Sequence, residues 1–243
     1  MNVVIVGHGF VGQATEYLLQ KTQCNIEIHD PVKGLTSDFE NTEYAFLCVP
    51  TPSNGTNLDL SVLKEVYHDY KDKCQLVIRS TIGPDQVSEF PEAYIMPEFL
   101  REKHWKADVD DNALPLIIGM NGYEGEFSEI FENIGKTVRI CSPKEASMFK
   151  LMRNTALAMR VALANEFYEI CNSETLNYST LSTMLQTDAW TGGTHWDVPG
   201  PDGKLGFGGN CFPKDLTHMA NLCYNDLNIM KVALVINELR RTS

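Results

Sequence analysis

Short runs of β-branched and other apolar residues alternate with amphipathic stretches through the first part of the chain. Glycine, proline, asparagine or aspartate bounds most of these runs, which is typical of buried strands, and the stretches between them repeat with helical spacing. Strands alternating with helices predict an α/β fold with a mostly parallel sheet. The predicted strands are Asn2–Val6, Asn25–His29, Tyr44–Val49, Gln75–Ser80, Tyr94–Met96 and Leu114–Gly119, and the predicted helices are Thr15–Lys21, Leu60–Tyr70 and Glu126–Ile134.

A different pattern opens the second part of the chain at Ser142-Pro143-Lys144-Glu145. This is a capping box with proline at the first helical position, so it specifies the start of a helix. No glycine or further proline follows until beyond Cys171, which predicts a helix of roughly 28 residues and roughly 42 Å. Further helices are predicted at Leu216–Tyr224 and Asn228–Arg240. We therefore expect an α/β domain over residues 1–141 and an all-helical domain with a long central helix over residues 142–243.

So long a helix needs packing partners along its whole surface. A second copy of the chain is the simplest partner, so we expect a homodimer formed through this helix.

Composition and charge exclude several classes of partner. The chain has 243 residues, 43% of them hydrophobic, and a net charge of −12, so it offers no basic surface for nucleic acid or an anionic membrane. Its start lacks the basic segment of a signal peptide, and no apolar run is long enough to span a membrane. Seven cysteines without a Cys-x-x-Cys pair predict neither a disulfide framework nor a metal site. We expect a cytoplasmic protein with reduced thiols.

A dinucleotide-binding fingerprint follows the first predicted strand. Gly7, Gly9 and Gly12, with Phe10 and Val11 between them, form Gly-x-Gly-x-x-Gly between a strand and a helix. Such glycines allow a tight turn, a close approach to pyrophosphate and close helix packing. The alternative is a βαβ unit that binds no nucleotide.

An acidic residue, Asp30, ends the second predicted strand 18 residues after Gly12, where the fingerprint places a carboxylate on the adenosine ribose. Since a carboxylate repels a 2′-phosphate, the predicted cofactor is NAD rather than NADP. The strand–turn–helix context therefore predicts a Rossmann NAD-binding domain.

Polar turns follow two more of the predicted strands. Ligands of parallel sheets bind beyond the carboxyl ends of the strands, so these turns should line the cofactor crevice. They contain Val49, Pro50 and Thr51 after one strand and Ser80 and Thr81 after the other.

A possible reactive thiol lies in Gly206-Phe207-Gly208-Gly209-Asn210-Cys211-Phe212-Pro213-Lys214-Asp215. The glycines let the backbone turn sharply and approach a ligand, and a thiol near a lysine loses its proton more readily. The alternative is an inert, buried cysteine. Two polar pairs elsewhere are spaced for one helical face, Glu98 with Glu102 and Lys150 with Asn154, although either pair could be a solvated or boundary feature.

These motifs together resemble the UDP-glucose 6-dehydrogenase / GDP-mannose 6-dehydrogenase family. The resemblance extends from Met1 to about Glu238, and its cysteine motif is highly specific. The matching segments, in the family's order, are Phe46–Pro52, Ser80–Pro84, Pro97–Glu102, Lys150 with Asn154, and Gly206–Asp215.

The resemblance implies a four-electron oxidation of a nucleotide sugar, with UDP-glucose favoured, of the kind used in polysaccharide biosynthesis. A primary alcohol is oxidised to an aldehyde, Cys211 adds to it, a second oxidation gives a thioester, and water releases the carboxylate. Lys150 and Asn154 would stabilise negative charge on the reacting oxygen. Asp215 and Thr81 would orient the water, with Glu98 favoured over Glu102 as the acid/base.

The resemblance also implies which residues hold the cofactor and the substrate. Glu102 would help to position NAD as well as the substrate. The remaining substrate contacts would come from Phe99, Leu100, Arg101, Lys150, Asn154, Lys204, Phe207, Gly208 and Gly209.

The chain departs from the family's pattern in two respects. Members usually continue into a third, Rossmann-like domain that clamps the nucleotide, whereas 28 residues follow Asp215 here, so the sequence predicts a short form. The family's arginine upstream of the glycine turn is absent, and His195 and Lys204 occupy that region.

Two other functions stay open. A β-hydroxyacid dehydrogenase would perform one oxidation without a thiol, and an NAD-binding module would perform none.

Overall fold

The computed structural model describes residues 1–55, 57–122, 125–223, 225 and 228–242. Its contacts divide the chain into two compact units. The first consists of Met1–Pro52 with Leu58–Lys150, and the second of Leu151–Ser243 with the short segment Ser53–Asn57. The division into domains 1–141 and 142–243 remains a prediction, since compactness alone does not show which parts fold as domains.

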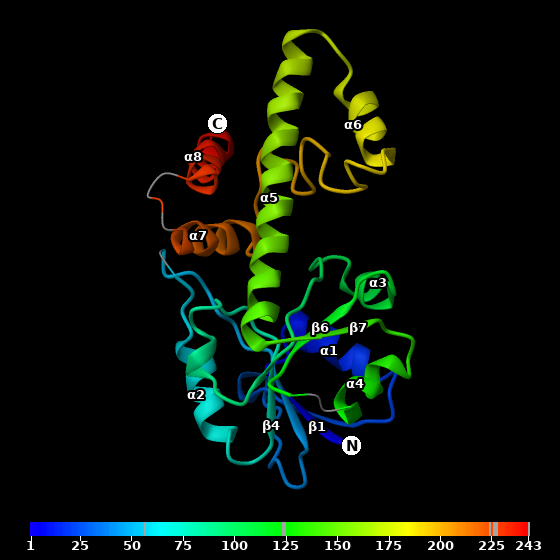
Figure 1. The fold of residues 1–243 in the computed structure, drawn as a ribbon, viewed down its shortest axis with the longest axis vertical. Helices are drawn as coiled ribbons and strands as arrows, with labels where there is room; N and C mark the ends of the chain where they lie inside the picture. The colour runs from blue at the N-terminus through cyan, green and yellow to red at the C-terminus, as the bar shows by residue number, and fades with distance from the viewer. Residues whose placement is uncertain (56, 123–124, 224, 226–227, 243) are drawn as a thin grey trace. The chain divides into compact units, whose positions relative to one another are not determined.

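The first unit is built on one sheet (Figure 1). Its seven strands lie in the order β2-β1-β3-β4-β5-β6-β7, and all neighbours are parallel except β5 and β6. The predicted α/β fold with a mostly parallel sheet is therefore confirmed. The strands are β1 (Asn2–Val6), β2 (Asn25–His29), β3 (Tyr44–Leu47), β4 (Gln75–Ile78), β5 (Tyr94–Ile95), β6 (Leu116–Gly119) and β7 (Val138–Cys141).

Helices cover both faces of this sheet. Helices α1 (Phe10–Leu19), α3 (Trp105–Asp110) and α4 (Gly125–Glu132) lie on one face, where their side chains join the hydrophobic cluster of Val3 and Ile5. Helix α2 (Ser61–Tyr70) lies on the other face with Val4 and Val6. Successive β1 side chains point to opposite faces, so one strand supplies both hydrophobic layers. Burial on both faces explains why β1 reads as an uninterrupted apolar run.

Several predicted boundaries differ from the structure. Helix α1 begins at Phe10 rather than Thr15, because Gly9 is already its N-cap and the glycine turn leads straight into the helix. Strands β3 and β4 each end two residues earlier than predicted, where the chain leaves the ladder to form the polar turns. Strand β6 begins only after Pro115, which has no N–H for a ladder bond.

Other elements were missed or wrongly assigned. Strand β7, helix α3 and helix α6 (Tyr178–Thr187) are not predicted from the sequence. Strand β7 leaves its two middle residues exposed at the sheet edge, so it lacks the apolar pattern of an inner strand. The prediction that Glu98 and Glu102 share a helical face is wrong, because neither lies in a helix: Glu98 is buried after β5, and Glu102 is exposed in a turn.

The long helix α5 (Pro143–Ser173) has 31 residues, and its predicted capping box is confirmed. The Ser142 backbone N–H donates to Glu145 Oε2 at 2.9 Å, and the Glu145 N–H donates to Ser142 Oγ at 3.3 Å. Its residues from Leu151 onward belong to the second unit.

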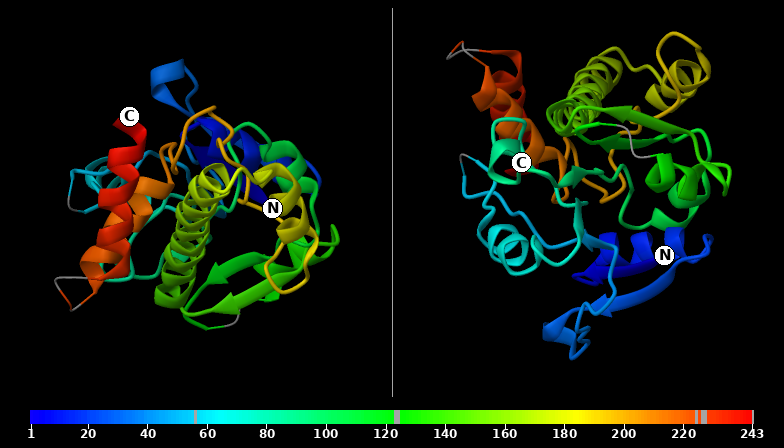
Figure 2. Two further views of the ribbon diagram at one scale, coloured as in Figure 1. Left: turned by 90° about the horizontal axis from the view of Figure 1, so that it is seen from above. Right: turned by 60° about the horizontal axis from the view of Figure 1, so that its bottom comes forward.

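In the second unit, side chains of other helices pack against α5. Tyr178 at the start of α6 meets Tyr168 edge to face, with ring centroids 5.5 Å apart. Helices α7 (Phe212–Leu222) and α8 (Ile229–Thr242) lie side by side (Figure 2), and Leu216 of α7 joins a buried cluster with Ala158. Helix α7 starts four residues before the predicted Leu216, and the predicted end at Tyr224 lies outside the described residues. No helix among the described residues is long and apolar enough to cross a membrane.

Candidate active site

The predicted nucleotide turn joins β1 to α1 in the first unit. Gly7 has φ +85°, a conformation that favours glycine, and a Cβ at Gly12 would overlap the Gly7 carbonyl oxygen. A Cβ at Gly9 would meet nothing within 4 Å. Two of the three fingerprint glycines are therefore required by the protein's own packing, whereas the space beside Gly9 is open.

The Asp30 side chain contacts the backbone at the start of this turn. Its Oδ2 accepts a 2.8 Å hydrogen bond from the His8 backbone N–H, between the first two glycines. Phe10 and Val11 form the first turn of α1 and are half-buried. The second strand therefore ends with its carboxylate at the glycine turn, next to the position where the fingerprint expects a ribose.

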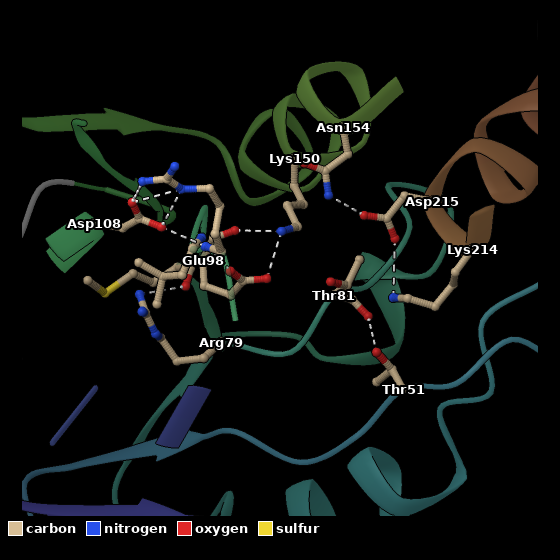
Figure 3. A network of polar contacts seen from close by, with 12 residues as sticks. Thr51, Arg79, Thr81, Glu98, Asp108, Lys150, Asn154, Lys214 and Asp215 are labelled. Carbon is tan, nitrogen blue, oxygen red and sulfur yellow. Dashed lines mark hydrogen bonds and ion pairs between the residues drawn. The ribbon is translucent and has the colours of Figure 1, made fainter. Parts of the chain in front are cut away.

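The two predicted polar turns lie next to one another after β3 and β4. The Thr51 hydroxyl donates to the Thr81 carbonyl at 2.7 Å (Figure 3), and the Ser80 hydroxyl donates to the Val49 carbonyl at 2.6 Å. Since the parallel strands β1, β3 and β4 are neighbours, both turns lie at the carboxyl edge with the glycine turn.

A buried ion pair joins Glu98 to Lys150 in the first unit (Figure 3). Lys150 Nζ donates to Glu98 Oε1 at 2.7 Å and to the Glu98 carbonyl at 2.6 Å, while the Leu100 N–H donates to Glu98 Oε2 at 2.7 Å. The two side chains are only 6% and 3% exposed. Phe99 packs edge to face on Phe149, at 5.5 Å between centroids, beside this pair.

The ion pair keeps Glu98 ionised. Burial by itself would raise the pKa of Glu98, but the Lys150 charge and the hydrogen bonds outweigh burial and hold that pKa below its ordinary value. Another contributor, not predicted from the sequence, is Arg79, which directly follows β4 and is 4% exposed. Arg79 donates to Thr15 Oγ1 and to the Met96 carbonyl, each at 3.2 Å, and its charge also favours the ionised carboxylate. The sequence signal that could have identified Arg79 is a charged residue directly before the polar turn at Ser80.

Two neighbours of Glu98 have other contacts. Arg101 binds Asp108 through its Nε and Nη2, and its backbone N–H donates to Asp108 Oδ2 at 2.7 Å. Burial would raise the pKa of Asp108, yet its bonds to Arg101 hold that pKa below the ordinary value. Leu100 packs against the hydrophobic cluster under α1.

A second polar chain lies in the second unit. Asn154 Nδ2 donates to Asp215 Oδ2 at 2.6 Å, and Lys214 Nζ lies 3.2 Å from Asp215 Oδ1 (Figure 3). The Asp215 side chain is fully buried. Lys150 and Asn154 lie one turn apart on α5, as the sequence predicted, and each carries one buried carboxylate contact.

Cys211 is the N-cap of α7 and is half-buried. The Asp215 N–H donates to the Cys211 carbonyl at 2.8 Å as the first bond of the helix. Gly206 and Gly209, which precede Cys211 in the turn, have φ +74° and +77°. None of the seven cysteines forms a disulfide, and no group of His, Cys, Asp or Glu within the described ranges could hold a metal ion.

The other predicted substrate-binding residues differ in burial, and His195 lies in the loop before the glycine turn. The Phe207 side chain is 2% exposed and packs with Ala158 and Leu216, so its ring belongs to the core of the second unit. Lys204 is exposed in the loop before the turn, where its backbone N–H donates to Asp202 Oδ1 at 3.1 Å. His195 packs near Phe212, with ring centroids 5.6 Å apart.

Comparison with known proteins agrees with these motifs. Residues 144–239 match the UDP-glucose/GDP-mannose dehydrogenase family, central domain. UDP-glucose 6-dehydrogenase of Rickettsia typhi is 31% identical over 84% of this chain. That match covers 51% of the relative, so the chain spans about half the length of this curated relative.

Solved structures share the fold. The UDP-D-ManNAc dehydrogenase of Pyrococcus horikoshii has a TM-score of 0.80 at 20% identity, covering 98% of this chain and 68% of that one. The 3-hydroxyisobutyrate dehydrogenase of Mycobacterium tuberculosis has a TM-score of 0.71 at 17% identity, covering 98% and 92%. At these identities the structures show the fold alone. The family match and the curated relative carry the assignment: this chain belongs to the UDP-glucose/GDP-mannose dehydrogenase family.

Proposed function

We propose that this chain carries the catalytic residues of a nucleotide-sugar 6-dehydrogenase that converts UDP-glucose to UDP-glucuronate, with two NAD and one water consumed. The observation that carries the proposal is the cap of α7. A half-buried thiol, Cys211, begins the helix, and a fully buried carboxylate, Asp215, follows one turn later, held by a hydrogen bond from Asn154 and an ion pair with Lys214. A β-hydroxyacid dehydrogenase has no use for that thiol.

The glycine turn fits a dinucleotide. The open space beside Gly9, the α1 amides and the Asp30 carboxylate are suited to a pyrophosphate and an adenosine ribose. Bound NAD would supply the hydride acceptor for both oxidations. Thr51 and Ser80 hold the neighbouring turns together and so shape the same edge of the sheet.

Proposed roles follow for the buried polar residues. The ammonium of Lys150 has three N–H donors, two of which go to Glu98, and the third would stabilise negative charge on the substrate oxygen. The Asn154 amide would do the same. Cys211 would add to the aldehyde carbon, and oxidation of that adduct would leave a thioester on its sulfur.

Hydrolysis of the thioester requires a base. We assign Glu98, which is buried beside Lys150, rather than the exposed Glu102 to accepting the proton of the attacking water. Asp215 and Thr81 would orient that water. The carboxylate product and the regenerated Cys211 thiol complete the cycle.

We also propose a homodimer through α5. Apolar side chains stay exposed along its second half, with Phe167 and Ile170 at 36% and 56%. With Leu181 and Met184 of α6 they line a groove of about 500 Å³. Exposed apolar surface of this kind marks association sites. Light scattering should give twice the chain mass, and a monomer at micromolar concentration would contradict the dimer.

Counting NADH tests the reaction. With a panel of UDP-, GDP- and dTDP-sugars, we expect two NADH for each sugar consumed and one preferred nucleotide. One NADH per substrate would favour a single-step β-hydroxyacid dehydrogenase, whose fold is also similar over nearly the whole chain. No NADH from any sugar or hydroxyacid would leave an NAD-binding module.

Replacing Asp30 with alanine should weaken NAD binding and reduce discrimination against NADP. The carboxylate is the group that accepts ribose hydroxyls and repels a 2′-phosphate, so losing it removes both effects. A tenfold loss of NAD affinity corresponds to about 1.4 kcal/mol. Titration of both cofactors by fluorescence measures the ratio, and an unchanged preference would show that another residue selects the cofactor.

Alanine at Gly9 and at Gly12 should have opposite effects. Gly12→Ala should lower the free energy of unfolding by about 1–3 kcal/mol, because its Cβ overlaps the Gly7 carbonyl. Gly9→Ala should keep the stability, since its Cβ meets nothing, and should weaken NAD binding by filling the space beside the turn. Denaturant titration and NAD titration separate the two variants. Equal NAD affinity in Gly9→Ala and the wild type would contradict the proposed nucleotide position.

A further inference from the structure

The turn before Cys211 is held by a side chain from α8. Asn237 Oδ1 accepts from the Phe207 backbone N–H at 2.7 Å, and Asn237 Nδ2 donates to the Phe207 carbonyl at 3.0 Å. The Asn237 side chain is buried, with 8% of the residue exposed. One amide group thus satisfies both backbone groups of Phe207, as a neighbouring strand would.

Side chains of the same helix lie close to two glycines of the motif. A Cβ at Gly206 would overlap Asn237 Oδ1, and a Cβ at Gly208 would lie 2.6 Å from the Arg241 Cζ. Arg241 lies one turn after Asn237 and pairs with Asp202 Oδ2 at 2.7 Å. Glycine is needed at Gly206, which also has φ +74°, whereas a side chain at Gly208 would require the end of the flexible Arg241 side chain to move.

A second asparagine supports the turn from α5. Asn165, which is 2% exposed, accepts from the Gly206 N–H through Oδ1 at 2.8 Å. Its own Nδ2 donates to the Val161 carbonyl at 2.8 Å, which fixes the orientation of the amide. Residues 41 and 30 positions away from the turn in sequence therefore hold two consecutive residues of it.

We propose that Asn237 is a positioning residue for Cys211, with Asn165 in the same role. Three residues, two of them glycines, separate Phe207 from Cys211, and glycines lose the most conformational freedom when they are ordered. Without a fixed anchor at Phe207, this segment would present the thiol in many orientations. The proposal rests on the proposed role of Cys211 as the nucleophile.

The test compares Asn237→Ala with a matched control, Ala233→Gly. Ala233 is buried one turn earlier on α8, and glycine there weakens the helix without touching the turn. We expect kcat for NADH formation from UDP-glucose to fall about tenfold or more in Asn237→Ala, with KM little changed, because a misplaced nucleophile slows the chemical step. Ala233→Gly should lose a similar amount of thermal stability and keep its kcat.

A second readout does not depend on turnover. The rate of Cys211 alkylation by iodoacetamide, followed by mass spectrometry of its peptide, should fall on the order of threefold in Asn237→Ala, because the thiolate loses its fixed place at the amino end of α7. The rate of Cys211 alkylation should fall by a similar factor in Asn165→Ala, although Asn165 lies on α5 and Asn237 on α8.

Two outcomes distinguish the proposals. If both asparagine variants keep the wild-type rate of Cys211 alkylation, while their Tm values equal that of the Ala233→Gly control, the positioning role is overturned. If the wild type forms no NADH from any nucleotide sugar while the alkylation rates still fall, the proposed function fails and the anchor of the turn stands.

Discussion

Changing Cys211 to serine should abolish formation of the carboxylate while NAD binding stays intact. A serine hydroxyl is a much poorer nucleophile than a thiol at neutral pH, so the aldehyde would not be held as a covalent adduct. We expect uronate production to fall by on the order of 10³-fold or more. The measurement is steady-state NADH release together with chromatography of the sugar products.

The control for this variant is Cys223→Ser. Cys223 is a partly buried thiol that caps the other end of α7, so the substitution tests loss of a thiol next to the same helix without touching Cys211. Activity near the wild-type level is expected in the control. Steady uronate production by Cys211→Ser would exclude the thioester route.

Removing the Lys150 charge should have the second largest effect. Lys150→Met leaves the Glu98 carboxylate buried without its main counter-charge, and breaking a buried pair from one side costs about 3–5 kcal/mol. The double variant Lys150→Met with Glu98→Gln should recover much of that stability, because no buried charge is then left unpaired. Denaturant unfolding at pH 7 measures all three proteins.

The same pair predicts the pH dependence of stability. The pKa of Glu98 is lower in the folded protein than in the unfolded chain, so the pair stabilises the fold above the ordinary glutamate pKa of about 4.3. That stability is lost as the pH falls through the lower, folded pKa. In Lys150→Met, the two lowering contributions of Lys150 are lost, so the pKa of Glu98 should be less depressed and acid should reduce stability less in this window.

Lys144→Met is the matched control, because Lys144 is an exposed lysine on the first turn of α5. It should keep the wild-type stability and its pH profile. A Lys150→Met protein as stable as this control would show that the ion pair contributes nothing to the fold. Activity should also fall in Lys150→Met, by about 10²–10³-fold, if the ammonium stabilises the reacting oxygen.

The sequence alone determined the elements whose signals are local. Strands β1 and β2 have the predicted bounds because their β-branched and apolar runs end at a glycine or a charge. The capping box at Ser142 located the start of α5 because both of its hydrogen bonds join residues three apart. The order of the motifs was also enough to recognise the family.

Only the tertiary structure decided which polar side chains meet. Glu98 and Lys150 are 52 residues apart, and Asn154 and Asp215 are 61 apart. Spacing had paired Glu98 with Glu102 instead, which is wrong because the chain there is not helical. Asn165 and Asn237 carry no local pattern, and their contacts, like those of Arg79, exist only because packed helices and strands bring distant segments together. The spacing of apolar residues along the sequence indicates which face of a helix or strand is apolar. The partner of a buried polar group depends instead on how those faces pack together in the fold.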